Sequence, residues 1–347
     1  MSDKRQSTSP RRDHRQEMTD SIIAALEKGV PPWRKSWQSG SLEMPLNPIS
    51  GKAYRGGNVL NLMLTSVKNS YDDPRWVTYR QAQEKGWQVR KGEHGTQIEF
   101  WKNIDAKDVR GLPDTKDRER FICRFYTVFN ACQIDGIPER EKPVRNEWQA
   151  VQSGESILRN SGAVIIHSQD SKAFYKKTTD TIHLPFKTSF HDAAGYYGTA
   201  LHELAHWSGA KDRLNRETLT ESVSFGDPTY AREELRAELA SVFLAAERGI
   251  PCDLDNNAAY MGSWLKALRE DRNEIFRAAR DAHKATDFLL ALELNRSLED
   301  ALAIADGHLP AVTNAPSVER TDEAASAVFE SPVNPRTPST TKTGMEM

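Results

Sequence analysis

The chain has 347 residues, of which 38% are hydrophobic and 28% are charged, proportions that are ordinary for a globular protein. No apolar run approaches the roughly 18 residues that a membrane-spanning helix needs, and the start, MSDKRQSTSPRRDHRQE, lacks the apolar core of a signal peptide. Three cysteines without a C-x-x-C spacing suit a reducing compartment. We therefore expect a cytoplasmic protein with no membrane partner.

The net charge of −2 conceals a difference between the two halves of the chain. Residues 1–140 contain 24 Lys and Arg against 18 Asp and Glu (+6), whereas residues 141–347 contain 23 against 31 (−8). Five of the eight tryptophans also lie in the basic half. A basic, aromatic segment is what a nucleic-acid surface needs, although aromatic residues also build cores.

The N-terminal half begins with a polar, basic stretch, 1–14, that is too poor in apolar residues to fold and is predicted to be a disordered arm. An amphipathic helix is predicted for 15–28, with Gly29 ending it. Further along, 59–67 has a helical pattern, and 97–101 and 121–130 have the β-branched and aromatic content of strands. This half is therefore predicted to be α+β.

Aromatic and basic residues alternate in four short segments: PPWRKSW, SGKAYRGGN, RWVTYRQA and GWQVRKGEHG. Bases stack on exposed aromatic rings while cations follow the phosphates, so the pattern is typical of surfaces that bind single strands. The alternative is a core with charged neighbours. The candidate DNA-binding residues are Trp33, Arg34, Lys35, Trp37, Lys52, Tyr54, Arg55, Arg80, Arg90 and Lys91, with Trp37 and Tyr54 as the first choices.

A linker is predicted at 141–147, because the segment PEREKPVR is charged, contains two prolines and coincides with the change in charge balance. Beyond it, the pattern predicts a helix at 148–160, a strand at 164–167 and a hairpin at 173–185. Helices follow at 259–268 and 273–294. From 309 onward Pro, Ser, Thr and Glu dominate, which predicts a flexible tail.

The segment FHDAAGYYGTALHELAHWSG, 190–209, contains His202, Glu203 and His206 in the pattern H-E-x-x-H. On a helix, residues four apart lie on one face, so the two imidazoles can converge on one zinc ion. Glu203 is rotated roughly 100° from His202 and is predicted to act as the general base. A histidine pair that merely fills a core is the alternative. Gly209 is expected to end the helix.

A zinc site of this class uses a third protein ligand and keeps one position open. The best source is YAREELRAELASVF, 230–243, which reads as a second amphipathic helix. Glu234 is predicted to bind the metal, and Glu238, one turn later, is predicted to hold a histidine N–H. Glu233 is the main competitor for the third ligand. Tyr230 and Tyr260 are candidates for stabilising the transition-state oxyanion.

Taken together, these segments resemble the ArdC-type anti-restriction proteins over roughly residues 15–295. The resemblance rests on PPWRKSW, NPISGKAYRGGN, WVTYRQAQEKGWQVRKGEHGTQIEFW, YTVFNACQIDGIP, YYGTALHELAHWSGAKDRLNR and YAREELRAELASVFL. It implies an α+β chain of two domains: a single-stranded DNA-binding domain at 15–140 and a mainly helical, zincin-like metallopeptidase domain with a small hairpin or sheet at 148–308. It also implies a role in protecting incoming plasmid DNA from restriction during conjugation.

Three functions follow from this pattern. In the first, the chain is a zinc peptidase whose protein substrate is unknown. In the second, it coats single-stranded DNA and its zincin domain only supports the fold or docks a partner. In the third, it cleaves proteins bound to DNA, a host restriction protein among the candidates. DNA binding and cleavage are expected to be coupled, because the short linker would keep the two parts close.

Overall fold

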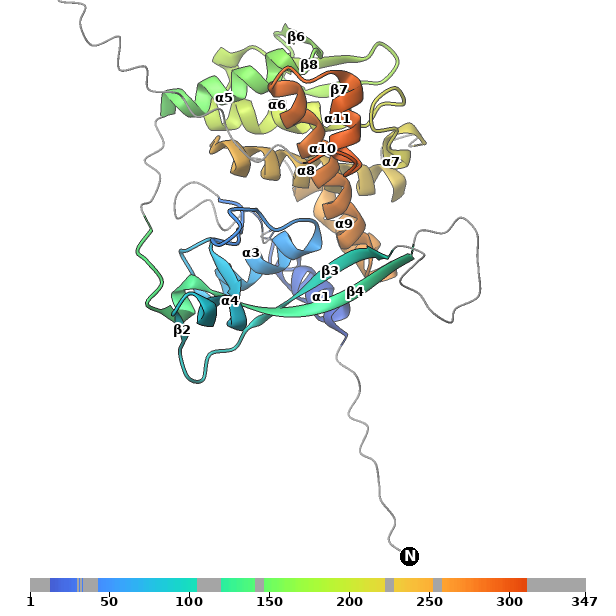
Figure 1. Cartoon of the computed structure of the whole chain (residues 1–347). Helices are drawn as coiled ribbons and strands as arrows, with labels where there is room; N and C mark the ends of the chain where they lie inside the picture. Colours follow the sequence, from blue (N-terminus) through green and yellow to red (C-terminus); the bar gives the residue numbers. More distant parts are fainter. Residues whose placement is uncertain are drawn as a thin grey trace, which may run out of the picture. The chain divides into compact units, whose positions relative to one another are not determined.

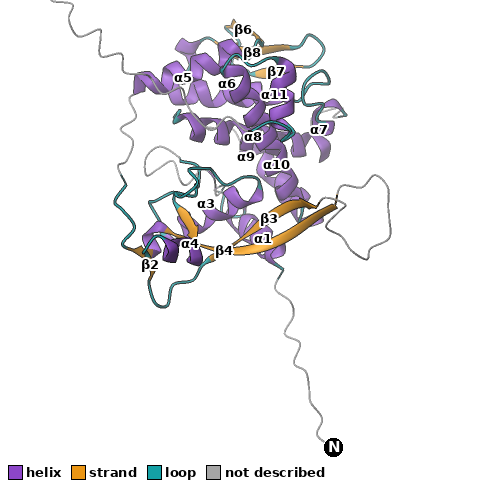
Figure 2. Cartoon of the chain, in the orientation of Figure 1, coloured by secondary structure: helices purple, strands orange, loops and turns teal. Residues whose placement is uncertain are grey.

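The computed structural model describes residues 13–29, 31, 33, 43–104, 120–140, 147–221, 228–251 and 258–310. All of them belong to one compact unit, residues 1–313. Figure 1 labels the elements, and Figure 2 shows that strands occur in both halves of the chain while helices dominate the second. Nearly all of the predicted N-terminal arm, linker and C-terminal tail falls outside the described residues.

The first half of the chain contains helices and short antiparallel sheets. Asp13 caps α1 (His14–Leu26) by accepting a hydrogen bond from the Gln16 N–H at 3.2 Å. Strands pair in the order β1-β4-β3, and β2 pairs with β5. The elements after α1 are α3 (Gly57–Asn69), β1 (Trp76–Thr78), α4 (Tyr79–Glu84), β2 (Gln88–Val89), β3 (Thr96–Ile104), β4 (Arg120–Asn130) and β5 (Ile134–Asp135).

The second half is mainly helical. Its three-stranded sheet has the order β6-β8-β7, with β6 parallel and β7 antiparallel to β8. The predicted hairpin is therefore confirmed, and its outer strand β7 is an edge of this sheet. The elements are α5 (Glu147–Asn160), β6 (Val164–Ser168), β7 (Phe174–Lys176), β8 (Thr181–Pro185), α6 (Ala193–Ser208), α7 (Glu217–Thr220), α8 (Pro228–Arg248), α9 (Ala258–Glu270), α10 (Glu274–Glu293) and α11 (Leu298–Ala305).

The two halves share one apolar core. Met18, Ile22 and Leu26 of α1 are buried in the same cluster as Leu239 and Phe243 of α8, together with residues of α9 and α10. Hydrogen bonds also connect α1 to the residues directly before α10. Arg15 donates to Asn273 Oδ1 at 3.0 Å, and Thr19 donates to the Arg272 carbonyl at 2.8 Å. The predicted linker thus joins two segments that are already packed together.

A second apolar core holds the C-terminal helices against their sheet. It contains Leu201 and Leu204 of α6, Leu184 of β8 and Phe288 of α10, all fully buried. This core fixes α6 between the sheet and α8, which is where the candidate site lies. Among the described residues, no helix has the length and apolar character needed to cross a bilayer.

Candidate metal centre

Helix α6 carries the H-E-x-x-H motif on a rigid, buried element. Asp192 caps its N-terminus by accepting from the Gly195 N–H at 2.9 Å, and Gly209 is its C-cap residue. Tyr197, Leu201 and Leu204 face the core. The helix therefore has the position expected from its apolar spacing, and the opposite face presents His202 and His206 to α8.

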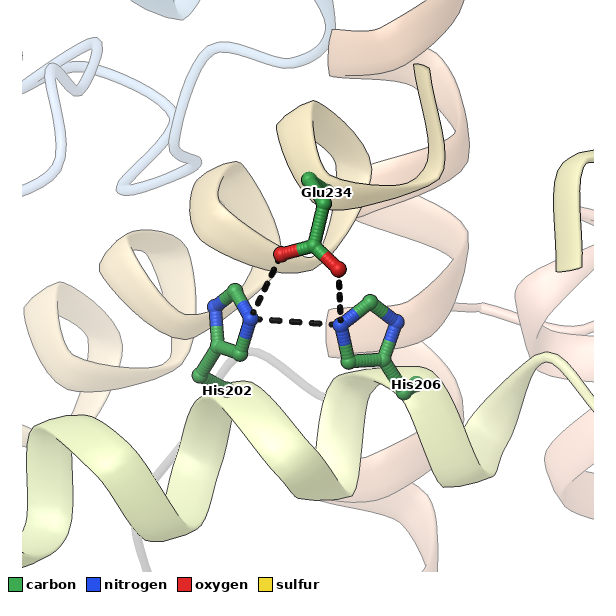
Figure 3. A group of neighbouring side chains, drawn as sticks. All are labelled: His202, His206 and Glu234. Carbon is green, nitrogen blue, oxygen red and sulfur yellow. Dashed lines mark hydrogen bonds and ion pairs between the residues drawn. The ribbon is translucent and has the colours of Figure 1, made fainter. Parts of the chain in front are cut away.

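Helix α8 lies beside α6 and supplies a carboxylate to the two imidazoles (Figure 3). The His202 Nε2 lies 3.2 Å from the His206 Nε2 and 3.3 Å from Oε2 of Glu234, whose Oε1 lies 3.4 Å from the His206 Nε2. All three side chains point toward one another from two helices. Among the described residues, they form the one group of three or more candidate metal ligands.

These separations fit a bound divalent metal. In a tetrahedral zinc site with bonds of about 2.0 to 2.1 Å, ligand atoms are about 3.3 to 3.4 Å apart. Two imidazole nitrogens and one carboxylate are also a donor set that zinc uses in peptidases. The arrangement can therefore accept the metal without a rearrangement of the helices.

The charges of the converging side chains shift one another's pKa values. Burial lowers the pKa of His206, but the carboxylates of Glu234 and Glu233 outweigh burial and raise it to about 10. Burial raises the pKa of Glu234, but the two histidines outweigh it and lower that pKa well below its usual range. The carboxylate of Glu234 is therefore ionised between the two imidazoles. Its negative charge favours the binding of a cation at this point.

Glu233, and not Glu238, contacts the outer nitrogen of His206. Its Oε1 lies 3.1 Å from the His206 Nδ1, and Arg216 donates to the same carboxylate at 2.6 and 2.9 Å. Thr218 adds a hydrogen bond of 2.6 Å. Burial opposes ionisation of Glu233, but Arg216 and His206 lower its pKa to about 2. A carboxylate that orients the outer nitrogen of a ligating histidine is a common feature of such sites.

The prediction for Glu238 is wrong. Its side chain is fully buried and accepts a hydrogen bond from the Trp33 indole N–H at 3.3 Å, on the side of α8 that faces the shared core. A position one turn from Glu234 therefore lies on the same broad helix face but contacts a different neighbour. His202 differs from His206, because its Nδ1 is buried without a hydrogen-bond partner among the described residues.

Glu203 lies beside the three converging residues. It is 8% exposed, and burial raises its pKa, as does the nearby Glu234, while the two histidines lower it. A carboxylate with a raised pKa is better matched to proton transfer near neutral pH. The hydroxyls of Tyr230 and Tyr260 lie 3.4 Å apart, and Tyr230 also hydrogen-bonds to Glu234. Burial and the charge of Glu234 raise the pKa of both phenols, so both stay protonated donors at neutral pH.

The candidate DNA-binding residues that the structure describes differ in burial. Trp33 is 1% exposed and packs against Trp264 in the shared core, so its ring has no open face for a base. The prediction that Trp33 stacks on a DNA base is wrong, because its ring is buried in the shared core. Tyr54 is half-buried, its hydroxyl donates to the Trp76 carbonyl at 2.9 Å, and burial raises its pKa to about 12.

The basic candidates are divided between paired and exposed positions. Arg55 forms an ion pair with the buried Asp287, and Arg90 bonds to Glu93 and Asp135. Arg80 pairs with Glu84 but is 86% exposed. Lys52 and Lys91 are exposed, and Arg34, Lys35 and Trp37 lie outside the described residues.

Sequence reasoning missed a group of exposed aromatic side chains on the β3–β4 hairpin. Adjacent residues of a strand point to opposite faces, so two consecutive aromatic residues cannot both enter the core beneath one face. That signal was present in Phe100-Trp101 and Phe125-Tyr126. The exposed fractions are 52% for Phe100, 52% for Trp101, 54% for Phe125 and 40% for Tyr126.

Two family models match the chain. Residues 12–129 match the N-terminal domain of the anti-restriction factor ArdC, and residues 152–281 match a zincin-like metallopeptidase. The chain is also similar to crystal structures of the antirestriction protein ArdC from plasmid R388, one metal-free and one bound to Mn(II). Both have a TM-score of 0.68, with 40% and 41% identity, over 82% of this chain and 100% of theirs.

Sequence relatives include longer proteins. Two DNA primases named TraC, both of Escherichia coli, are 46% and 42% identical over 80% and 82% of this chain. The matched region spans 27% and 20% of those primases, so the chain corresponds to only a quarter to a fifth of their length. The uncharacterised protein y4eC of Sinorhizobium fredii is 38% identical over 79% of this chain and 90% of its own length.

Proposed function

Because this chain belongs to the ArdC family of antirestriction proteins, we propose that it binds single-stranded DNA, protects incoming plasmid DNA during conjugation, and carries a zinc-dependent peptidase centre. The proposed setting is the cytoplasm of the cell that receives the DNA. The similarity to two proteins named as DNA primases supports a DNA partner. The proposed protein substrate is a host restriction protein or another protein bound to DNA.

The observation that carries the peptidase proposal is the convergence of His202, His206 and Glu234. Their spacing supports zinc as the resident metal, and the Mn(II)-bound structure of the similar ArdC protein supports a divalent ion as a ligand in this family. When bound, a zinc ion would polarise the scissile carbonyl and lower the pKa of water.

The side chains around the centre have separate tasks in this proposal. Glu203 takes a proton from the attacking water and passes it to the leaving amine. Glu233 and Arg216 fix the ring of His206 through its Nδ1. Tyr230 or Tyr260 donates a hydrogen bond to the developing oxyanion. The edge strand β7, which contacts α6, offers a backbone edge to which an extended peptide substrate can pair.

The test is plasmid transfer into a restricting recipient, with wild type beside Glu203→Gln. Glutamine keeps the shape of the side chain but cannot accept a proton, so the variant should retain the metal and lose protection if cleavage is needed. Full protection by Glu203→Gln would remove cleavage from the protective mechanism and favour the alternative, a DNA-coating protein whose zincin domain is structural. His202→Ala, which removes a ligand, serves as the matched loss-of-metal variant.

A further inference from the structure

A cavity of about 1330 Å³ lies between the first half of the chain and α10, separate from the metal centre. One side is lined by residues 51–56 and the start of α3, together with Arg15 of α1 and Trp101 of β3. The other side is α10, whose residues line it at three- and four-residue intervals from Asn273 to Leu290. The cleft therefore follows one face of a long helix and is built by both halves of the shared core.

The rim of this cleft carries basic side chains interleaved with carboxylates. Arg277, Arg280 and Lys284 follow one another along α10, with side chains 38%, 63% and 41% exposed. Arg277 pairs with Asp271 and Glu274, and Arg280 pairs with Asp281, so a phosphate would have to compete with these surface carboxylates. Across the cleft, Lys52 is exposed and Arg55 is 48% exposed. The carboxylates of Glu99 and Asp287 lie beneath, each with 7% exposure of its side chain. Glu43, Glu247 and Asp306 also line the cleft, and Asp306 pairs with Lys284 at 2.7 Å.

The aromatic ring of Trp101 also lies at this rim, and a hydrogen bond fixes its orientation. Trp101 is 52% exposed, and its indole N–H donates to Oε2 of Glu99 at 3.0 Å. The Arg15 guanidinium lies 5.5 Å from the ring centroid. The ring is thus held in place on one side while half of its surface is open to a ligand in the cleft. Stacked bases and a row of cations are the two features of single-strand binding sites.

We infer that this cleft is the binding site for single-stranded DNA, with phosphates along Arg277, Arg280 and Lys284 and a base stacked on Trp101. Seven residues of helix span about 10 Å, which covers two or three consecutive phosphates. The assignment rests on the proposed binding of single-stranded DNA and gives it a location that includes the C-terminal helix α10. An N-terminal fragment would lack half of this site.

The test measures binding of a labelled oligothymidylate of about 12 nucleotides to the full chain by fluorescence anisotropy, at several salt concentrations. Each lost phosphate contact should lower the magnitude of the log–log salt slope by about 0.7, which is about fivefold in affinity at 0.1 M salt. Arg280→Ala and Lys284→Ala should each show this loss. Trp101→Ala should weaken binding about 5- to 150-fold, and Trp101→Phe, which keeps a stacking ring, should recover much of it.

Arg269→Ala is the matched control, because Arg269 is 58% exposed, has one surface ion pair with Glu27 and lies outside the cleft. It should bind as wild type does. If wild type binds and the α10 variants bind equally well, the cleft is wrong while the proposed DNA binding stands. If wild type does not bind the oligonucleotide, both fail. Displacement of the oligonucleotide by an acidic peptide at equal charge would also overturn the assignment to DNA.

Discussion

The Nδ1 of His206 lies 3.1 Å from Oε1 of Glu233, and both oxygens of the same carboxylate accept hydrogen bonds from Arg216. This contact fixes which nitrogen of His206 faces the metal centre, because the outer nitrogen is committed to Glu233. We therefore assign Glu233 the role of positioning His206, whereas the sequence pattern offers it only as a competitor for the third ligand.

We predict that Glu233→Gln lowers metal affinity about 10- to 100-fold. Glutamine can still accept from His206, but it loses the charge that supports the imidazole and leaves Arg216 without its ionic partner. Competition with a chromophoric chelator measures the affinity, and circular dichroism checks folding. Glu238→Gln is the control, since Glu238 contacts Trp33 instead. Equal loss of affinity in both variants would contradict the assigned role.

Metal content should separate the ligands from the base. We predict that Glu234→Ala and His202→Ala lose bound zinc, because each removes one of three donors, whereas Glu203→Gln retains it. Elemental analysis of the purified proteins after dialysis measures this directly. Wild type without any divalent metal after incubation with zinc would reject the centre, and normal zinc in Glu234→Ala would reassign the third ligand.

Trp33 should behave as a core residue. We predict that Trp33→Ala lowers the free energy of unfolding by about 3 to 5 kcal/mol, the usual cost of truncating a large buried aromatic side chain. Denaturant unfolding measures it. Trp148→Ala is the control, because Trp148 is 80% exposed, and its effect should be about 0.5 kcal/mol or less. A folded Trp33→Ala protein of normal stability that no longer binds DNA would restore the stacking role.

Stability should fall on acidification because of a buried histidine. Burial and the charge of Arg55 lower the pKa of His283 to about 3, against an ordinary value of about 6.5. Between pH 6.5 and 3, His283 is protonated in the unfolded chain but neutral in the folded chain. The free energy of unfolding therefore decreases progressively as the pH falls through that window. The effect is about 2 kcal/mol at pH 5 relative to neutral pH.

We predict that His283→Gln flattens the pH dependence of unfolding in this window. Glutamine cannot ionise but can accept the hydrogen bond that the Gly56 N–H donates to the His283 Nδ1 at 3.3 Å. Urea unfolding at pH 7 and pH 5 gives the comparison. The same substitution at His191, whose side chain is fully exposed, should leave the wild-type curve unchanged. An unchanged slope in His283→Gln would contradict the assignment.

The sequence predicts those parts of the site that lie within one helix. His202 and His206 are one turn apart, so their convergence requires only that α6 be helical. Placing Glu234 requires α8 to pack against α6, which the apolar spacing of both helices favours. The helices at 15–28, 148–160, 259–268 and 273–294 correspond to α1, α5, α9 and α10 for the same reason.

The spacing of residues in the sequence does not predict which side chain of a helix contacts which neighbouring element. Glu238 shares a helix face with Glu234, but the angle between α6 and α8 brings Glu233 to His206 and leaves Glu238 against Trp33. A tryptophan between basic residues also reads the same whether its ring is exposed or buried. The short helices α4 and α11 escape prediction because fewer than ten residues give a weak periodic signal.

The core that α1 shares with α8, α9 and α10 has a consequence for proteolysis. A cut between residues 140 and 147 would sever the chain without separating its products, since each product would have to expose the apolar side chains that the other covers. The nicked protein should co-elute as a non-covalent pair under native conditions and separate only in denaturant. Two fragments made in different cells should, by the same reasoning, complement one another on mixing.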